Sequence, residues 1–415
     1  MAALLARVGH LPRVRSALVG IALVGALGQL GPSTPDVTPT LPVPSGAPAA
    51  RSGTAGADVP SGVRAAVDAL LERRAAAWRA ADPRAWRMTV DEGAVGGQVE
   101  LFEALGRLPL DAWSEELTAL EPTGPASWHA SVVVRYRLAG DDADALVRGV
   151  LDVTPELRVR GATFTPVPPW EINDVASATG EHSIVVGGAD AELLRRYAAE
   201  LDGAARSVGL LVGRPASRMV LILADDWQQA RRMVPGGAGA GLAALTTPLE
   251  PSGLPAGPIR VLADPHLLAT LDAPTRVALL GHEAFHVATR AMGPVPLWLS
   301  EGLADYAGYR GAGVPVETAV AGLLRQVRSD GPPVALPDDD AFADPARVTQ
   351  AYEGAHLAVR LLAAAHGDQQ VLELYRRVAQ DGPQSLGHAL EDVLGTDLAT
   401  VTIRWRAEVS ALAGY

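Results

Sequence analysis

The chain has 415 residues, no cysteine and a formal net charge of −12. Without cysteine it can form neither disulfides nor thiolate metal sites, and its acidic balance argues against a nucleic-acid partner. The length exceeds that of a typical single domain, so two folded units are predicted.

The N-terminus combines basic residues with an apolar run. Arg7, Arg13 and Arg15 precede an uncharged stretch over 16–31. This pattern predicts a signal peptide or an N-terminal membrane anchor over residues 1–31. In both cases we expect the rest of the chain to be extracytoplasmic, either secreted or held at the membrane by the uncleaved segment.

Residues 32–60 are rich in Pro, Gly, Ser, Thr and Ala and contain few large apolar side chains. Such a composition cannot bury enough surface to offset the entropy lost on ordering. A disordered linker is therefore predicted here.

The segment 61–175 predicts a small α+β accessory domain. Apolar residues recur at helical spacing after Ser61, and shorter helical pieces are expected around 98–118. Trp128–Leu138 and Glu156–Gly161 are predicted strands. Helices followed by a curved antiparallel sheet resemble the cone-shaped nuclear-transport-factor-like or SnoaL-like folds. Such a unit could bind a ligand or serve as a structural spacer, and the sequence leaves both roles open.

The segment 180–415 predicts a second unit that begins as strands and a helix and ends as helices. Predicted strands are His182–Val186, Arg218–Leu223 and Pro258–Ala263, with a helix over 189–208. The last part is predicted to be helical over 315–328, 344–365, 368–380, 384–393 and 397–412.

An H-E-x-x-H motif lies in the middle of this second unit, at His282–His286. Asp272 followed by proline predicts a helix start, and Gly293-Pro294 predicts its end. On a helix the two histidines lie one turn apart on one face and can bind one metal ion. Glu283 then lies near the open side of the metal, where it can take a proton from a bound water.

A third metal ligand is expected, because zinc in hydrolases usually has three protein ligands and one open position. The candidate is Glu301, with fourteen residues between it and His286, after a Gly-Pro-Val-Pro turn. Asp305 lies one helical turn beyond Glu301. It can accept a hydrogen bond from the far nitrogen of a ligand histidine and so fix the orientation of the ring.

The H-E-x-x-H motif together with Trp-Leu-Ser-Glu-Gly-Leu-Ala-Asp-Tyr over 298–306 resembles the gluzincin zinc metallopeptidases, and more narrowly the bacterial peptidase MA-like family. The resemblance covers roughly residues 180–415. It implies a Zn²⁺ ion bound by His282, His286 and Glu301.

The same resemblance implies roles for further residues. Glu283 would be the general base, and Asp305 the acid behind a ligand histidine. A tyrosine or histidine on a later helix would stabilise the oxyanion, for which Tyr352 is the first choice and His356 the second. The strand Pro258–Ala263 would lie at the sheet edge beside the cleft and pair with extended substrate.

An exported zinc metallopeptidase acting on a peptide or protein substrate is therefore expected. Two alternatives stay open: a non-catalytic extracytoplasmic binding or sensor protein with a structural metal site, and a peptidoglycan-directed hydrolase. Glu283 favours an enzyme, because a purely structural site has no use for a base beside the metal.

Overall fold

A computed structural model describes residues 61–415 apart from 125, 189, 214–217, 236–242, 250, 252 and 256, together with the backbone of 19–20. The predicted signal or anchor segment and the predicted linker otherwise lie outside the described residues. Among the residues described, none of the helices has the length and apolarity needed to cross a membrane.

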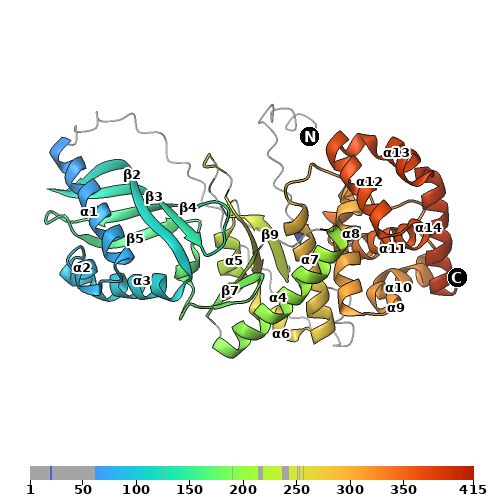
Figure 1. The fold of residues 1–415 in the computed structure, drawn as a ribbon, viewed down its shortest axis with the longest axis horizontal. Coiled ribbons are helices and arrows are strands. Elements are labelled where there is room, and N and C mark those ends of the chain that lie inside the picture. Colours follow the sequence, from blue (N-terminus) through green and yellow to red (C-terminus); the bar gives the residue numbers. More distant parts are fainter. Residues whose placement is uncertain are drawn as a thin grey trace, which may run out of the picture.

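The protein is a mixed α+β structure with two sheets, so the predicted class is confirmed (Figure 1). The first folded part contains three helices and a four-stranded antiparallel sheet in the order β2-β3-β4-β5. Its elements are α1 (Ser61–Arg79), α2 (Pro83–Arg87), α3 (Val95–Arg107), β2 (Leu110–Gly124), β3 (Ser127–Leu138), β4 (Ala145–Val153) and β5 (Val159–Thr165).

The helix predicted around 98–118 is wrong beyond Arg107, because β2 follows and pairs with β3. The side chains of β2 alternate in burial, but one inward position is the acidic Glu115. Its carboxylate Oε2 accepts a hydrogen bond from Nε of the buried Arg74 at 2.7 Å. A charged residue at an inward position interrupts the alternation of apolar and polar residues from which a strand is predicted.

The second sheet has the strand order β1-β9-β10-β8-β7-β6. Strands β7, β8 and β10 are parallel, while β6 and β9 pair antiparallel with their neighbours. The strands are β1 (Val19–Gly20), β6 (Ala176–Thr179), β7 (Ser183–Gly187), β8 (Met219–Leu223), β9 (Ala244–Pro248) and β10 (Ile259–Ala263).

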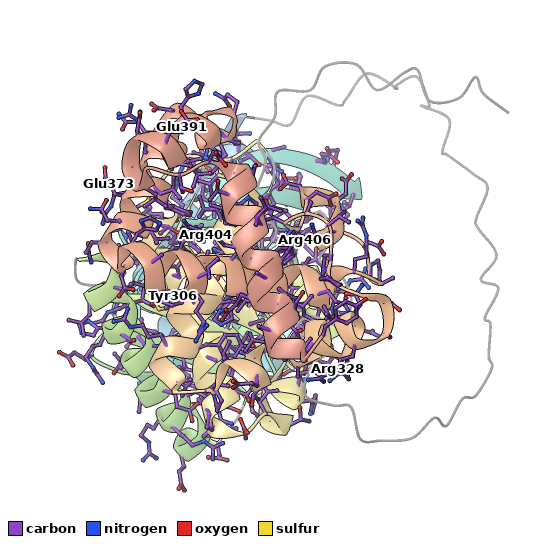
Figure 2. The ribbon with its side chains drawn as sticks, turned by 90° about the vertical axis from the view of Figure 1, so that its right-hand side faces the viewer. Tyr306, Arg328, Glu373, Glu391, Arg404 and Arg406 are labelled. Carbon is purple, nitrogen blue, oxygen red and sulfur yellow. The ribbon has the colours of Figure 1, made fainter. Side chains whose placement is uncertain are left out.

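The chain after β10 is helical throughout its regular elements, as predicted for the C-terminal part. Figure 2 shows α14 lying across the helices at this end of the molecule. The helices of the second part are α4 (Ala191–Val212), α5 (Trp227–Met233), α6 (Pro265–Thr270), α7 (Ala273–Thr289), α8 (Leu297–Ala312), α9 (Val316–Ala319), α10 (Ala321–Asp330), α11 (Val348–His366), α12 (Asp368–Asp381), α13 (Leu386–Ala389) and α14 (Leu398–Ala413).

The second sheet is covered on both faces, which is why β7, β8 and β10 are mostly apolar, with Ser183 and Arg260 as buried polar exceptions. Val185 and Leu221 belong to one hydrophobic core, together with α4, α7, α8 and the C-terminal helices. Ile184 and Ile222 belong to another core, which continues into the four-stranded sheet and includes Trp170. One hydrophobic core therefore spans the predicted boundary between the two units; the separate domains over 61–175 and 180–415 stay a prediction.

Ion pairs join the two parts at the turn between β3 and β4. Both guanidinium nitrogens Nη1 and Nη2 of Arg260 on β10 donate to the carboxylate of Asp141, at 2.7 and 2.5 Å. Asp142 pairs with Arg290, the residue immediately after α7. The turn is thus fixed both to the sheet and to the end of the helix that carries the H-E-x-x-H motif.

Candidate metal centre

The H-E-x-x-H motif lies on α7, as its flanking residues predict. Asp272 caps the helix by accepting a hydrogen bond from the backbone N–H of Thr275 at 2.8 Å, and a proline occupies the first turn. His282 and His286 are both buried, and α7 packs against α8, α4 and β9.

Helices α7 and α8 approach unusually closely because two glycines face each other. A Cβ atom on Gly281 would lie 2.7 Å from Cα of Gly308, and one on Gly308 would lie 2.1 Å from the carbonyl oxygen of Ala278. Neither position can hold a larger residue without moving the helices apart. This contact brings the acidic residues of α8 up to the histidines of α7.

Glu301 lies beside both histidines, as its place in the sequence predicts. Its Oε2 is 3.3 Å from Nε2 of His282 and 3.5 Å from Nε2 of His286. The two Nε2 atoms are 2.9 Å apart. In the part of the chain that the structure describes, these three side chains form the one group of histidine, aspartate or glutamate residues able to hold a metal ion.

Two of the three spacings fit a small tetrahedral ion, whereas the 2.9 Å between the two Nε2 atoms is shorter than bound ligands would have. Ligand atoms about 2.0–2.2 Å from a tetrahedral centre lie about 3.3–3.6 Å from each other, close to the two histidine–glutamate distances. The donor set of two imidazoles and one carboxylate is one that zinc hydrolases use. Moreover, Oε2 of Glu301 is buried and has no hydrogen-bond partner among the described residues, so a cation would satisfy it.

Asp305 forms a hydrogen bond with His282 at the ring nitrogen that faces away from Glu301. Its Oδ1 lies 2.8 Å from Nδ1 of His282, which directs Nε2 of that ring toward Glu301. Burial alone would lower the pKa of His282, but the hydrogen bond to Asp305 and the neighbouring carboxylate of Glu301 raise it to about 10. Burial alone would raise the pKa of Glu301, but the two imidazoles lower it to about 2. Metal-free, the site therefore favours an imidazolium between carboxylates.

Glu283 is completely buried next to these ligands, and burial raises its pKa. One carboxylate oxygen, Oε2, accepts a hydrogen bond from the hydroxyl of Thr246 on β9. The other, Oε1, is buried and lacks a hydrogen-bond partner within the described residues. A carboxylate with one oxygen held and one oxygen free can accept a proton from a nearby water.

Tyr352 and His356, the two candidates for oxyanion stabilisation, both lie on α11 but in different surroundings. The ring of Tyr352 lies 6.2 Å from that of His282, and its hydroxyl bonds to Glu301. Burial and the nearby carboxylates raise the pKa of Tyr352 far above its usual value of 10, so the phenol keeps its proton. His356 instead packs against Tyr309 at 5.0 Å between ring centres, and burial lowers its pKa to about 4. Tyr352 is thus the one beside the ligands.

Strand β10 is not the strand beside Glu283, so the edge role expected for Pro258–Ala263 is wrong. It pairs with β8 on one side and β9 on the other, and is therefore interior. Strand β9 lies against α7 and supplies Thr246. This residue was missed by the sequence analysis, although the Thr-Thr pair over 246–247 has the β-branched side chains typical of a strand.

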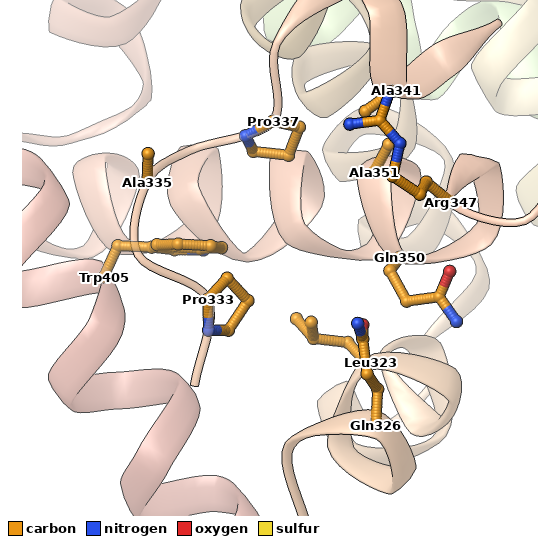
Figure 3. Close-up of a pocket in the computed structure, with 10 residues that line it drawn as sticks. All are labelled: Leu323, Gln326, Pro333, Ala335, Pro337, Ala341, Arg347, Gln350, Ala351 and Trp405. Carbon is orange, nitrogen blue, oxygen red and sulfur yellow. The ribbon is translucent and has the colours of Figure 1, made fainter. Parts of the chain in front are cut away.

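A pocket near the C-terminus is separate from the metal centre. Figure 3 shows the ring of Trp405 on one side of it and the amides of Gln326 and Gln350 on the other. Its lining is mainly apolar, without histidine or carboxylate, and so offers no ligand set for a metal. It reaches Ala351, the residue before Tyr352.

Comparison with known proteins does not identify this chain: no protein-family model and no curated protein sequence matches it. The fold and the site define a mixed α+β protein with a candidate His-His-Glu metal centre between two closely packed helices. Its function therefore has to be inferred from the site residues themselves.

Proposed function

We propose that the protein is a zinc-dependent peptidase of the gluzincin type, similar to the peptidase MA-like family, acting on a peptide or protein substrate. The observation that carries this proposal is the buried carboxylate of Glu283, with Oε1 free, beside a complete set of metal ligands. A buried carboxylate with an unpartnered oxygen costs free energy that a purely structural site has no reason to bear.

Bound zinc supplies Lewis acidity, which lowers the pKa of a water and polarises a carbonyl. His282, His286 and Glu301 would hold the ion, with Asp305 keeping Nδ1 of His282 protonated. Glu283 accepts the proton of the attacking water at Oε1 and then donates it to the leaving amine. The phenol of Tyr352 keeps its proton near neutral pH and can donate a hydrogen bond to the developing oxyanion.

The wider setting of this activity is part of the proposal. An N-terminal signal peptide or membrane anchor would place the enzyme outside the cytoplasm, secreted or tethered to the membrane. The part over 61–175 would be an accessory domain resembling the SnoaL-like cone. Its four-stranded antiparallel sheet with helices α1 to α3 on the same unit supports that resemblance.

The test compares the wild-type chain with Glu283→Gln. Metal analysis after purification should find about one zinc per chain in both proteins, because Glu283 is not a ligand. Digestion of a broad peptide library should show cleavage by the wild type and a loss of at least about 100-fold in the variant. Equal activity of the two proteins contradicts the role of Glu283. Zinc binding without any cleavage by the wild type would instead indicate a structural metal site.

A further inference from the structure

Strand β9 contains two threonines, and one of them contacts a residue of α7, the helix with the H-E-x-x-H motif. Thr246 is buried, and its hydroxyl donates to Oε2 of Glu283 from a strand that contacts α7. The neighbouring Thr247 is equally buried, but its hydroxyl donates to the backbone carbonyl of Pro248 at 3.1 Å. Successive strand residues point to opposite faces, so only Thr246 can reach the site.

The hydrogen bond constrains Glu283 because the carboxylate is planar. A hydrogen bond to Oε2 limits the rotation of the carboxylate about the last side-chain torsion of Glu283. Because the group is planar, the position of Oε1 is then limited as well. That torsion has broad minima when no partner fixes it. Among the residues described, Oε1 has no hydrogen-bond partner of its own, so Thr246 is the side chain that sets its direction.

We propose that Thr246 is a positioning residue that holds Glu283 with Oε1 turned toward the metal ligands. This inference rests on the proposed function for the role of Glu283, and adds to it a residue on a different element. A hydrogen bond to a buried charged group is also stronger than one between neutral groups. Removing the hydroxyl should therefore free the carboxylate to rotate.

The variants isolate the hydroxyl. Thr246→Val keeps the shape of the side chain but removes the donor, whereas Thr246→Ser keeps the donor. Thr247→Val is the matched control, because that threonine is just as buried and does not bond to Glu283. If Thr246→Val fails to fold, Thr246→Ala removes the same hydroxyl with less bulk.

The first readout needs no substrate. Crystal structures of the metal-free full-length chains should show one orientation of Glu283 in wild type, Thr246→Ser and Thr247→Val. In Thr246→Val the carboxylate should be rotated or divided between orientations. The same single orientation in Thr246→Val overturns the inference, whether or not the protein is an enzyme.

A second readout uses the zinc-loaded chains and acetohydroxamic acid, which gives its acidic proton to a neighbouring base when it chelates a metal as the acetohydroxamate anion. Calorimetry should show about 10- to 100-fold weaker binding to Thr246→Val, the size of a hydrogen bond to a charged group. Thr246→Ser and Thr247→Val should bind within about twofold of the wild type. Imidazole, which binds the metal without needing a base, should bind all four proteins equally. Unchanged acetohydroxamate affinity in Thr246→Val overturns the inference.

A third readout applies to a peptide that the wild type cleaves. Thr246→Val should lower kcat about 10- to 100-fold with KM within about twofold, because orientation of the base matters in the transition state and not in binding. Thr246→Ser should restore kcat. If the wild type cleaves no peptide, the proposed function fails, while the two readouts above still decide the role of Thr246.

Discussion

His282 is held on both sides of its imidazole ring. Nδ1 faces Asp305 at 2.8 Å and Nε2 faces Glu301 at 3.3 Å. Burial lowers the pKa of the ring, and these two carboxylates raise it to about 10. In the metal-free protein the ring therefore carries its extra proton at neutral pH, and only the deprotonated Nε2 can bind a metal.

Zinc uptake is accordingly expected to release a proton from His282. The folded-state pKa of about 10 lies above the working pH, so the bound proton must leave before Nε2 can bind. Apparent zinc affinity should rise about tenfold per pH unit between pH 6 and 8. Calorimetry in buffers of different ionisation enthalpy would measure the protons released. An affinity independent of pH over this range contradicts the raised pKa.

At the scale of elements, the geometry of the candidate metal centre depends on how closely α7 and α8 pack. Gly281 and Gly308 form their contact, and a Cβ on Gly308 would lie 2.1 Å from a backbone carbonyl oxygen. The histidines come from α7, whereas Glu301 and Asp305 come from α8. A shift of one helix relative to the other separates these two sets of ligands.

Gly308→Ala should therefore destabilise the fold and weaken zinc binding together. Overpacking at such a contact costs about 1–3 kcal/mol of unfolding free energy, and movement of Glu301 away from the histidines should lower zinc affinity. The matched control is Gly203→Ala on α4, where an added Cβ meets nothing within 4 Å. That change should stabilise the protein by about 0.5–1 kcal/mol. Denaturant unfolding and zinc titration of both variants are the measurements; normal zinc affinity in Gly308→Ala contradicts the close-packing argument.

At the scale of the whole molecule, a shared hydrophobic core and a buried ion pair join the part over 61–175 to the part that contains the candidate metal site. The side chains of Asp141 and Arg260 are 5% and 2% exposed. By contrast, Asp142 and Arg290 are 64% and 28% exposed in the neighbouring pair. Figure 1 shows the four-stranded sheet at one end, the second sheet in the middle and the helices at the other.

Asp141→Ala should destabilise the protein far more than Asp142→Ala. Removing one partner of a buried pair leaves the other charge uncompensated, at a cost of about 3–5 kcal/mol. An exposed pair contributes about 0–1 kcal/mol. Denaturant unfolding followed by tryptophan fluorescence would measure the free energies of unfolding. Equal destabilisation by the two changes would mean that the buried pair does not fasten the two parts.

Local spacing in the sequence was enough for much of the site. Helical periodicity depends on residues three and four apart, so it places His282 and His286 on one face of α7 before any tertiary contact is known. The Gly-Pro-Val-Pro turn likewise returns Glu301 and Asp305 toward them. The helical C-terminal part and the α+β class follow from the same short-range patterns.

Tertiary packing alone decided the rest, because the partners are far apart in sequence. Thr246 meets Glu283 across 37 positions, and Asp141 meets Arg260 across 119. No local period relates such residues; they meet because the second sheet packs against α7 on one face and against the four-stranded sheet on the other. The sequence by itself determined which side chains could bind a metal on α7 and α8. The tertiary structure decided which threonine donates a hydrogen bond to Glu283 and which residue of α11 lies beside the candidate ligand His282.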